Sequence, residues 1–222
     1  MKTTDPQHEL FDILDFHGNP TGNVKARGLV HRDGDWHRGL HVWIYGCNGA
    51  GEPFMLFQRR SMSKDTWPGK LDVAVGGHFS AGEALEETLR ETEEEIGLEA
   101  SVEQLVPLGR RFIEDIGDTY IDRELDEVFA LRCDQPLDAY RMHPEEVDAL
   151  VTVELTALHR MFHDDAATIP AHEFVRDGEH ATRISISLAD FAGDRAAYRK
   201  AAVDGVRELA GGRQPQQFEL RE

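Results

Sequence analysis

Residues 76–98 read GGHFSAGEALEETLRETEEEIGL. Eight glutamates fall between Glu83 and Glu99, and Arg90 is the only basic residue among them. An ordinary surface helix mixes its charges, because like charges one turn apart repel by roughly 0.2–0.5 kcal/mol per pair. The stretch therefore indicates a place where a positive charge binds.

The spacing of apolar residues in this stretch predicts one helix that begins near Gly82. At about 100° per residue, its apolar side chains form a narrow stripe for core packing, and a set of glutamates lies roughly opposite. The stripe consists of Leu85, Leu89, Thr92 and Ile96, and the glutamates are Glu83, Glu87, Glu91, Glu94 and Glu95.

Glu91 and Glu95 are four residues apart, so their carboxylates project one above the other. This pair is unfavourable unless a cation binds to it, and clustered oxygen ligands on one rigid element suit Mg²⁺ or Mn²⁺. The preceding GGHFSAG loop makes the carbonyl of Gly76 or Gly77 a candidate for a further ligand. The alternative is a solvated acidic helix face.

The order of residues favours the metal site. The stretch resembles the Nudix hydrolase signature, G-x5-E-x7-R-E-U-x-E-E-x-G-U with U apolar. Thr92 stands at an apolar position, and six residues instead of seven separate Glu83 from Arg90, which leaves the role of Glu83 open. The matching residues are Gly77, Glu83, Arg90, Glu91, Glu94, Glu95, Gly97 and Leu98.

This resemblance implies an α/β fold, a Nudix-type α/β/α sandwich around a mixed β-sheet. It also implies metal-dependent hydrolysis of a diphosphate linked to another group, because divalent ions neutralise the diphosphate and stabilise charge in the transition state. Glu91, Glu95 and the Gly76 carbonyl are then the expected Mg²⁺ or Mn²⁺ ligands, with Glu94 as ligand or base. Arg90 is expected to orient the neighbouring carboxylates. Glu127, at the start of a strand, is the candidate ligand outside the signature.

A finer resemblance covers residues 36–45, WHRGLHVWIY, and 55–78, MLFQRRSMSKDTWPGKLDVAVGGH. Both look like the isopentenyl diphosphate isomerase branch of the superfamily. Leu71 replaces a tryptophan of that branch, and Gly76 replaces its catalytic cysteine. His37 aligns with a metal-binding histidine of the branch and His78 is kept, although each is equally consistent with a hydrogen-bonded structural histidine.

Cations are scarce near the signature, so three that precede it are candidate phosphate contacts: Arg59, Arg60 and Lys64. Simple solubility is the alternative for these side chains. His159 and His163 are also four residues apart, but with no cysteine or third histidine near them in the sequence they are interpreted as a solvated pair.

Composition limits the partners. A net charge of -18 argues against nucleic acid and against an anionic membrane as a main partner. The sequence has no apolar run long enough to span a bilayer, and its opening residues lack the pattern of a signal peptide. Cys47 and Cys133 lie beside apolar residues, as expected for buried thiols in a reducing compartment. We therefore expect a cytoplasmic protein that acts on a small diphosphate.

We expect three parts in the chain: an N-terminal strand extension (1–35), a Nudix hydrolase domain as the resemblance implies (36–170), and a C-terminal helical extension with a tail (171–222). Strands are expected over 11–16, 40–46, 53–60, 105–113 and 126–132, a strand and helix over 145–163, a helix over 188–212, and a frayed end over 213–222. The short pieces within 10–35 must pack on the core or on a partner subunit, so a homodimer is expected.

Two other functions stay open. One is an isomerase of allylic diphosphates, which Gly76 disfavours because glycine supplies no thiol. The other is a catalytically silent Nudix domain that binds a ligand, which the retained Glu91, Glu94 and Glu95 disfavour.

Overall fold

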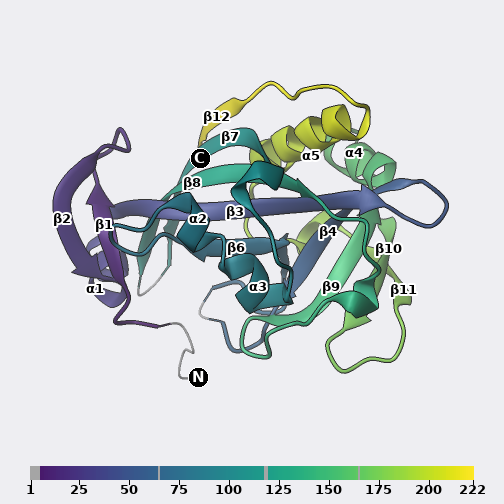
Figure 1. Cartoon of the computed structure of the whole chain (residues 1–222), viewed down its shortest axis with the longest axis horizontal. Coiled ribbons are helices and arrows are strands. Elements are labelled where there is room, and N and C mark those ends of the chain that lie inside the picture. Colours follow the sequence, from purple (N-terminus) through teal and green to yellow (C-terminus); the bar gives the residue numbers. More distant parts are fainter. Residues whose placement is uncertain (1–5, 65, 118–119, 165) are drawn as a thin grey trace.

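In the part of the chain that the structure describes, a twelve-stranded mixed sheet organises the fold (Figure 1). The computed structural model describes residues 6–64, 66–117, 120–164 and 166–222. Its strands are β1 (Leu10–Leu14), β2 (Pro20–Ala26), β3 (Trp36–Cys47), β4 (Pro53–Arg60), β5 (Leu71–Val73), β6 (Val75–His78), β7 (Leu105–Ile116), β8 (Ile121–Arg132), β9 (Val147–Glu154), β10 (Ile169–Val175), β11 (Thr182–Ile186) and β12 (Phe218–Arg221). Its α-helices are α1 (Arg27–Asp33), α2 (Leu85–Thr88), α3 (Glu91–Ile96), α4 (Leu155–His163) and α5 (Ala196–Ala210).

The long central strand β3 changes partner along its length. It pairs with β8 in parallel from Trp36 to Tyr45, while on its other edge it pairs with β6 over Gly39–Val42 and with β4 over Ile44–Cys47. The sheet therefore divides near the start of β3, and β5 and β6 enter the space between β3 and β4.

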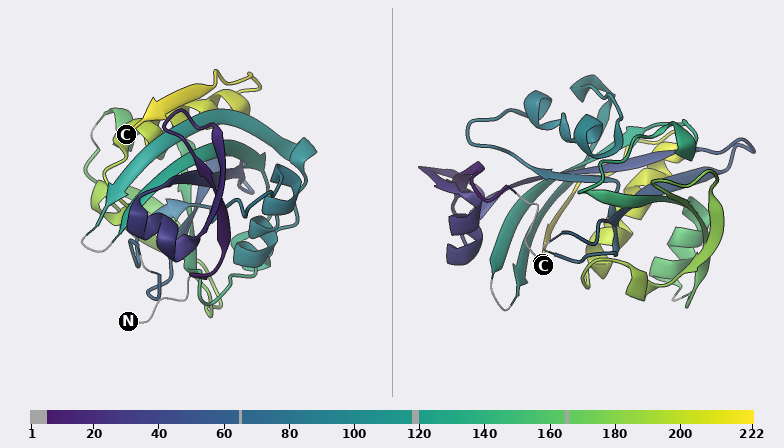
Figure 2. Two further views of the ribbon diagram at one scale, coloured as in Figure 1. Left: turned by 90° about the vertical axis from the view of Figure 1, so that its left-hand side faces the viewer. Right: turned by 90° about the horizontal axis from the view of Figure 1, so that it is seen from below.

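Alternation along β3 gives the sheet two buried faces. Trp43 and Tyr45 pack with α4 and α5, whereas Val42 and Ile44 pack with α3. The helices accordingly cover opposite faces, as the right-hand view of Figure 2 shows. The predicted α/β/α sandwich around a mixed sheet is confirmed.

The predicted single helix of residues 82–98 is wrong in one respect, because it is broken into α2 and α3. Between them the backbone bonds run from residue i to i−3, as in Arg90 N–H to the Glu87 carbonyl and Thr92 N–H to the Leu89 carbonyl. A tighter turn of this type uses fewer residues. This tighter turn accommodates the spacer between Glu83 and Arg90, which is one residue shorter than in the signature. The glutamates of α3 therefore keep the spacing of the signature.

The end of the chain is not frayed, contrary to the sequence prediction. β12 pairs in parallel with β7, placing Phe218 beside Gly109. Gly109 has φ +147°, and a Cβ there would lie 2.7 Å from the Phe218 nitrogen, so only glycine permits this approach. The pairing joins segments distant in sequence, which a local pattern does not reveal.

Other local predictions hold, with additions. β1, β3, β4, β7, β8, β9 and α4 lie where strands and helices were expected, while α1, β10 and β11 were not predicted. The C-terminal helix α5 begins at Ala196, eight residues after its predicted start at residue 188, because a separate 3-10 turn occupies Leu188–Asp190. Cys47 and Cys133 are free thiols, but they are half-buried rather than buried. Within the described ranges, no helix has the length and apolar character needed to cross a membrane.

Candidate active site

A cavity of about 560 Å³ opens where the sheet divides. Residues from the N-terminal segment, the strands β3 to β6, the helix α3 and the strand β8 contribute to its wall. Its polar lining includes the carboxylates Glu91, Glu94, Glu95, Asp122 and Glu124, the cations Arg60, Lys64 and Arg90, and the imidazoles of His31, His41 and His78.

Glu91 and Glu95 of α3 line this cavity, and their carboxylates have little access to solvent. Glu95 is only 4% exposed and accepts a hydrogen bond from Gln58 Nε2 at 3.0 Å. Burial raises the pKa of Glu91 to about 7, with Glu94 adding to the effect, and burial together with the charge of Glu91 raises the pKa of Glu95. These carboxylates lack enough positive charge around them, which is the electrostatic setting of a cation site.

Gly77 lets α3 approach the sheet. A Cβ at this position would lie 2.6 Å from Cγ and 2.7 Å from Cδ of Glu91. Glycine therefore fixes the place of the Glu91 carboxylate, and Gly76 lines the same cavity beside it.

We predict that Gly77→Ala displaces the Glu91 side chain and weakens Mn²⁺ binding by about tenfold, as expected when support of a metal ligand is lost. Titration calorimetry measures the affinity, and thermal melting checks the fold. Gly49→Ala is the matched control, because a Cβ at Gly49 meets nothing within 4 Å. Equal Mn²⁺ affinity in the two variants would contradict this role of Gly77.

Arg90 contacts three carboxylates. It forms an ion pair with Glu83, lies 3.2 Å from Glu91 Oε1, and lies 3.6 Å from Glu94 Oε1. Glu83 also accepts a hydrogen bond from the Ser80 N–H at 2.8 Å, so it ties the loop to Arg90. With 60% of its side chain exposed, Glu94 is more exposed than Glu83 and Glu91. The geometry thus agrees with an orienting role for Arg90 and gives Glu83 a structural contact.

The structure does not bring Glu127 to the other candidate ligands. Its side chain pairs with Arg38 at 2.5 Å, and the Arg38 guanidinium lies over the Phe79 ring. Neighbouring positions on β8 project to opposite faces, so Asp122 and Glu124 line the cavity while Glu127 does not.

Of the three candidate phosphate contacts, two line the cavity and the third, Arg59, does not. Arg60 and Lys64 line the cavity, where Arg60 lies 3.5 Å from Asp72 and Lys64 lies 2.5 Å from Glu146. Arg59 points elsewhere and forms an ion pair with Glu173 at 2.6 Å.

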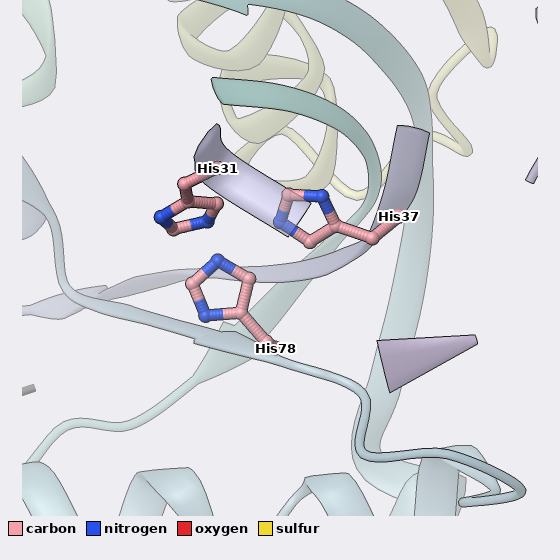
Figure 3. A group of neighbouring side chains, drawn as sticks. All are labelled: His31, His37 and His78. Carbon is pink, nitrogen blue, oxygen red and sulfur yellow. The ribbon is translucent and has the colours of Figure 1, made fainter. Parts of the chain in front are cut away.

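A cluster of three histidines lies beside the cavity, where His31 and His78 line the wall and His37 is buried behind it. The sequence reasoning had considered only His37 and His78. Figure 3 shows the rings of His31, His37 and His78 pointing toward one another from α1, β3 and β6. The His37 ring centroid lies 5.3 Å from each of the other two. His78 Nε2 lies 2.8 Å from Glu124 Oε1, and His37 Nε2 lies 3.6 Å from Asp122 Oδ1.

The tautomer of His37 indicates what this cluster can bind. His37 Nδ1 lies 3.2 Å from the Asp35 carbonyl and donates to it, which leaves the lone pair of Nε2 facing Asp122. In the described parts of the chain, His37 Nε2 and Asp122 Oδ1 are both buried without a hydrogen-bond partner. Burial lowers the pKa of His37 to about 3, aided by the nearby His78, and burial raises the pKa of Asp122, aided by Glu124. A proton on Asp122 or a bound transition metal would satisfy both atoms.

The N-terminal segment builds this cluster. Phe11 of β1 stacks on His37 and on His78, each with ring centroids 5.0 Å apart. The Ala81 N–H donates to the Leu10 carbonyl and the Gly82 N–H donates to Asp12, so β1 also holds the loop before α2. Sequence reasoning missed His31, Asp122 and Glu124. The alternation D-x-E-x-D over 122–126 was the available signal for the two acids.

His159 and His163 lie far from this cavity on α4. Their rings stack at 4.3 Å, and His163 Nε2 lies 3.1 Å from Asp204 on α5. The expected solvated pair therefore has a third polar neighbour.

Comparison with known proteins decides the family. The NUDIX domain pattern matches residues 36–175. The chain belongs to the Nudix family. A Nudix hydrolase of Clostridium acetobutylicum, itself called uncharacterized, is 31% identical over 173 residues, which cover 78% of this chain and 83% of that protein.

Two further relatives extend this picture. Nudix hydrolase 3 of Arabidopsis thaliana is 38% identical over 148 residues, covering 64% of this chain but only 19% of the plant protein. This Nudix chain therefore spans about a fifth of that relative. Isopentenyl-diphosphate Delta-isomerase of an Enterobacter species is 33% identical over 131 residues, covering 56% of this chain and 67% of the isomerase.

Among solved structures, DR0079 from Deinococcus radiodurans superposes with a TM-score of 0.53 at 21% identity, covering 86% of this chain and 98% of the other. This similarity supports the Nudix fold.

Proposed function

We propose that this protein is a metal-dependent Nudix hydrolase that cleaves the diphosphate bond of a nucleoside diphosphate derivative or another diphosphate-linked compound. The observation that carries the proposal is the pair of carboxylates, half-buried Glu91 and buried Glu95, on a cavity that also presents Arg60 and Lys64. Negative charge that Arg90 compensates only in part, beside two further cations, suits a metal ion and a diphosphate bound together.

Mg²⁺ or Mn²⁺ is the proposed cofactor. Glu91, Glu95 and Glu94 would hold it, with the carbonyl of Gly76 as a further ligand, and oxygen donors of this kind fit hard divalent cations. When bound, the ion supplies positive charge that offsets the charge of the diphosphate and stabilises the transition state.

The remaining groups bind and orient. Arg60 and Lys64 would receive phosphate oxygens by releasing their ion-pair partners, Asp72 and Glu146. Arg60 also donates to the carbonyl and hydroxyl of Thr66, which hold its guanidinium in place. Arg90 holds Glu91 in position, and the exposed Glu94 is free to act as ligand or base.

A panel of nucleoside diphosphate derivatives, dinucleoside polyphosphates and diphosphate alcohols, assayed with Mg²⁺ for phosphate and nucleotide products, tests this function. Cleavage of at least one compound is expected. Complete inactivity across the panel with both Mg²⁺ and Mn²⁺ would count against hydrolysis.

The histidine cluster favours one second candidate, an isomerase of allylic diphosphates. The aligned His37 and the retained His78 lie together with Glu124, as a metal-assisted isomerase would require. Gly76 opposes this function because its backbone cannot transfer protons to and from carbon.

We predict no interconversion of isopentenyl and dimethylallyl diphosphates. Incubation with isopentenyl diphosphate in heavy water and Mg²⁺, followed by mass spectrometry, is the test. Deuterated dimethylallyl diphosphate formed at an enzymatic rate, with no hydrolysis in the panel, would favour the isomerase function over hydrolysis.

A homodimer and a cytoplasmic location also stay proposals. The N-terminal segment exposes several apolar side chains, including Leu10 (51%), Val24 (48%) and Leu29 (43%), which suits contact with a second subunit. We expect light scattering at micromolar concentration to give about twice the chain mass of 25.0 kDa. A mass near that of one chain at every concentration would exclude the dimer.

A further inference from the structure

His41 of β3 also lines the cavity, but it belongs neither to the glutamates of α3 nor to the histidine cluster. It is 8% exposed and pairs across the sheet with Gly76 of β6. Its Nδ1 lies 2.7 Å from the Tyr198 hydroxyl oxygen, which in turn lies 2.9 Å from Trp43 Nε1. Sequence reasoning gave none of these three side chains a role.

Counting protons along this chain fixes the tautomer of His41. The indole N–H of Trp43 can only donate, so the Tyr198 oxygen accepts from it. The Tyr198 hydroxyl has one proton, and in the described residues its only other partner is His41 Nδ1. Tyr198 therefore donates to Nδ1, and the proton of a neutral His41 must be on Nε2.

The surroundings keep these groups in that state. Burial lowers the pKa of His41, and the cation Arg111 adds to the effect, while the carboxylates Asp126, Asp72 and Glu124 act against it. Arg111 and Asp126 are fully buried and bonded to each other, so they bring little net charge to the ring. Burial also raises the pKa of Tyr198 far above the working range. The hydroxyl thus stays a donor.

The protonated edge of His41 lies beside Gly76 on the cavity wall, and one ring nitrogen of His41 lies within 4.8 Å of carboxylate oxygens of Glu124 and Asp126. A Cβ at Gly76 would lie 3.6 Å from both Nε2 and Cδ2 of His41, where any other residue would place its side chain. In the described chain Nε2 has no hydrogen-bond partner, although His41 lines the cavity. The next residue, Gly77, contacts Glu91, so this donor lies beside the candidate metal ligands.

We propose that His41 contacts the substrate, donating its Nε2–H to a non-bridging oxygen of the bound diphosphate, and that Tyr198 is a positioning residue that fixes the required tautomer. This inference rests on the proposed function and adds a specific contact to it. A neutral donor on the cavity wall stabilises phosphate charge without adding another ionisable cation.

Nuclear magnetic resonance of protein labelled with ¹⁵N-histidine tests the tautomer without any assay of turnover. We expect the His41 signals of a neutral ring protonated on Nε2, and a shift of the Nε2 signal when Mg²⁺ and inorganic pyrophosphate are added. Tyr198→Phe, which loses only the hydroxyl, should give a mixture of the two tautomers. A wild-type ring protonated on Nδ1, or signals unchanged by pyrophosphate, would overturn the proposal.

Two amide variants separate the contact from general packing. His41→Gln can place its amide N–H near the position of Nε2, whereas His41→Asn reaches only toward Tyr198. We expect pyrophosphate to bind about tenfold more weakly to the Asn variant, the loss typical of one hydrogen bond to a charged group, and within about threefold of wild type to the Gln variant. Equal affinities in the two variants would contradict the contact.

The same experiments distinguish this inference from the proposed function. If a panel compound is hydrolysed while pyrophosphate leaves His41 unchanged, hydrolysis stands and the His41 contact is wrong. If pyrophosphate shifts His41 but no panel compound is cleaved, the contact stands and the proposed hydrolysis is wrong.

Discussion

Glu95→Gln should lower turnover by about 10²–10³-fold while the fold stays intact, a loss typical of removing one group that stabilises transition-state charge. Glu95 is buried at the cavity and already accepts a hydrogen bond from Gln58. A glutamine keeps the size and one oxygen of the side chain but removes its charge. Steady-state kinetics on the best panel substrate, with saturating Mg²⁺, measures the effect.

Glu93→Gln is the matched control, because Glu93 is exposed on the same helix and does not line the cavity. It should leave turnover within about twofold of wild type, as for most surface substitutions. Wild-type turnover in Glu95→Gln would remove this carboxylate from the metal site.

The stability that Glu91 contributes to the metal-free protein should be lost as pH rises from about 4.5 to about 7. Buried His37, whose pKa is lowered to about 3, acts in the opposite direction, so the loss is measured as the difference between wild type and Glu91→Gln. The folded state raises the pKa of Glu91 from its ordinary 4.5 to about 7, chiefly by burial. A raised pKa means that the folded protein binds the proton more tightly than the unfolded chain does. The stability from that proton is complete below the ordinary pKa and is lost as pH passes the folded one, by about 3 kcal/mol. The raised pKa of Glu95 acts in the same direction.

Urea unfolding in excess chelator at several pH values measures this loss. Glu91→Gln has no carboxyl to ionise, so its free energy of unfolding should rise relative to wild type across the same pH window. Exposed Glu86 serves as the control site, and Glu86→Gln should follow wild type. Addition of Mg²⁺ should reduce the loss in wild type, since a ligand that binds only the folded state stabilises it. If the free energy of unfolding depends on pH in the same way for wild type and Glu91→Gln, the folded state does not raise the pKa of Glu91.

Local sequence patterns predicted the parts of the site that are continuous in the chain. Glu91 and Glu95 follow helical spacing, and Arg90 reaches its carboxylate partners within the same segment. The break between α2 and α3 was not predicted, because periodicity alone cannot tell where a missing residue is absorbed.

Features that depend on strand pairing were not predictable in this way. Glu127 and Glu124 are equally acidic in the sequence, and only the register of β8 against β3 decides which one faces the cavity. Likewise, Tyr198 on α5 reaches His41 across more than 150 residues, as the separation of 157 positions shows. Only the packed fold brings such pairs together.

Hydrolysis in ¹⁸O-labelled water tests the central claim most directly. The best panel substrate is incubated with Mg²⁺, and its phosphate products are followed by ³¹P nuclear magnetic resonance. Wild type should release products that carry one ¹⁸O on the attacked phosphorus, and excess chelator or Glu95→Gln should suppress them. A substrate that stays intact and takes up no ¹⁸O would contradict metal-dependent hydrolysis at Glu91 and Glu95. Cleavage that continues in excess chelator would contradict it as well.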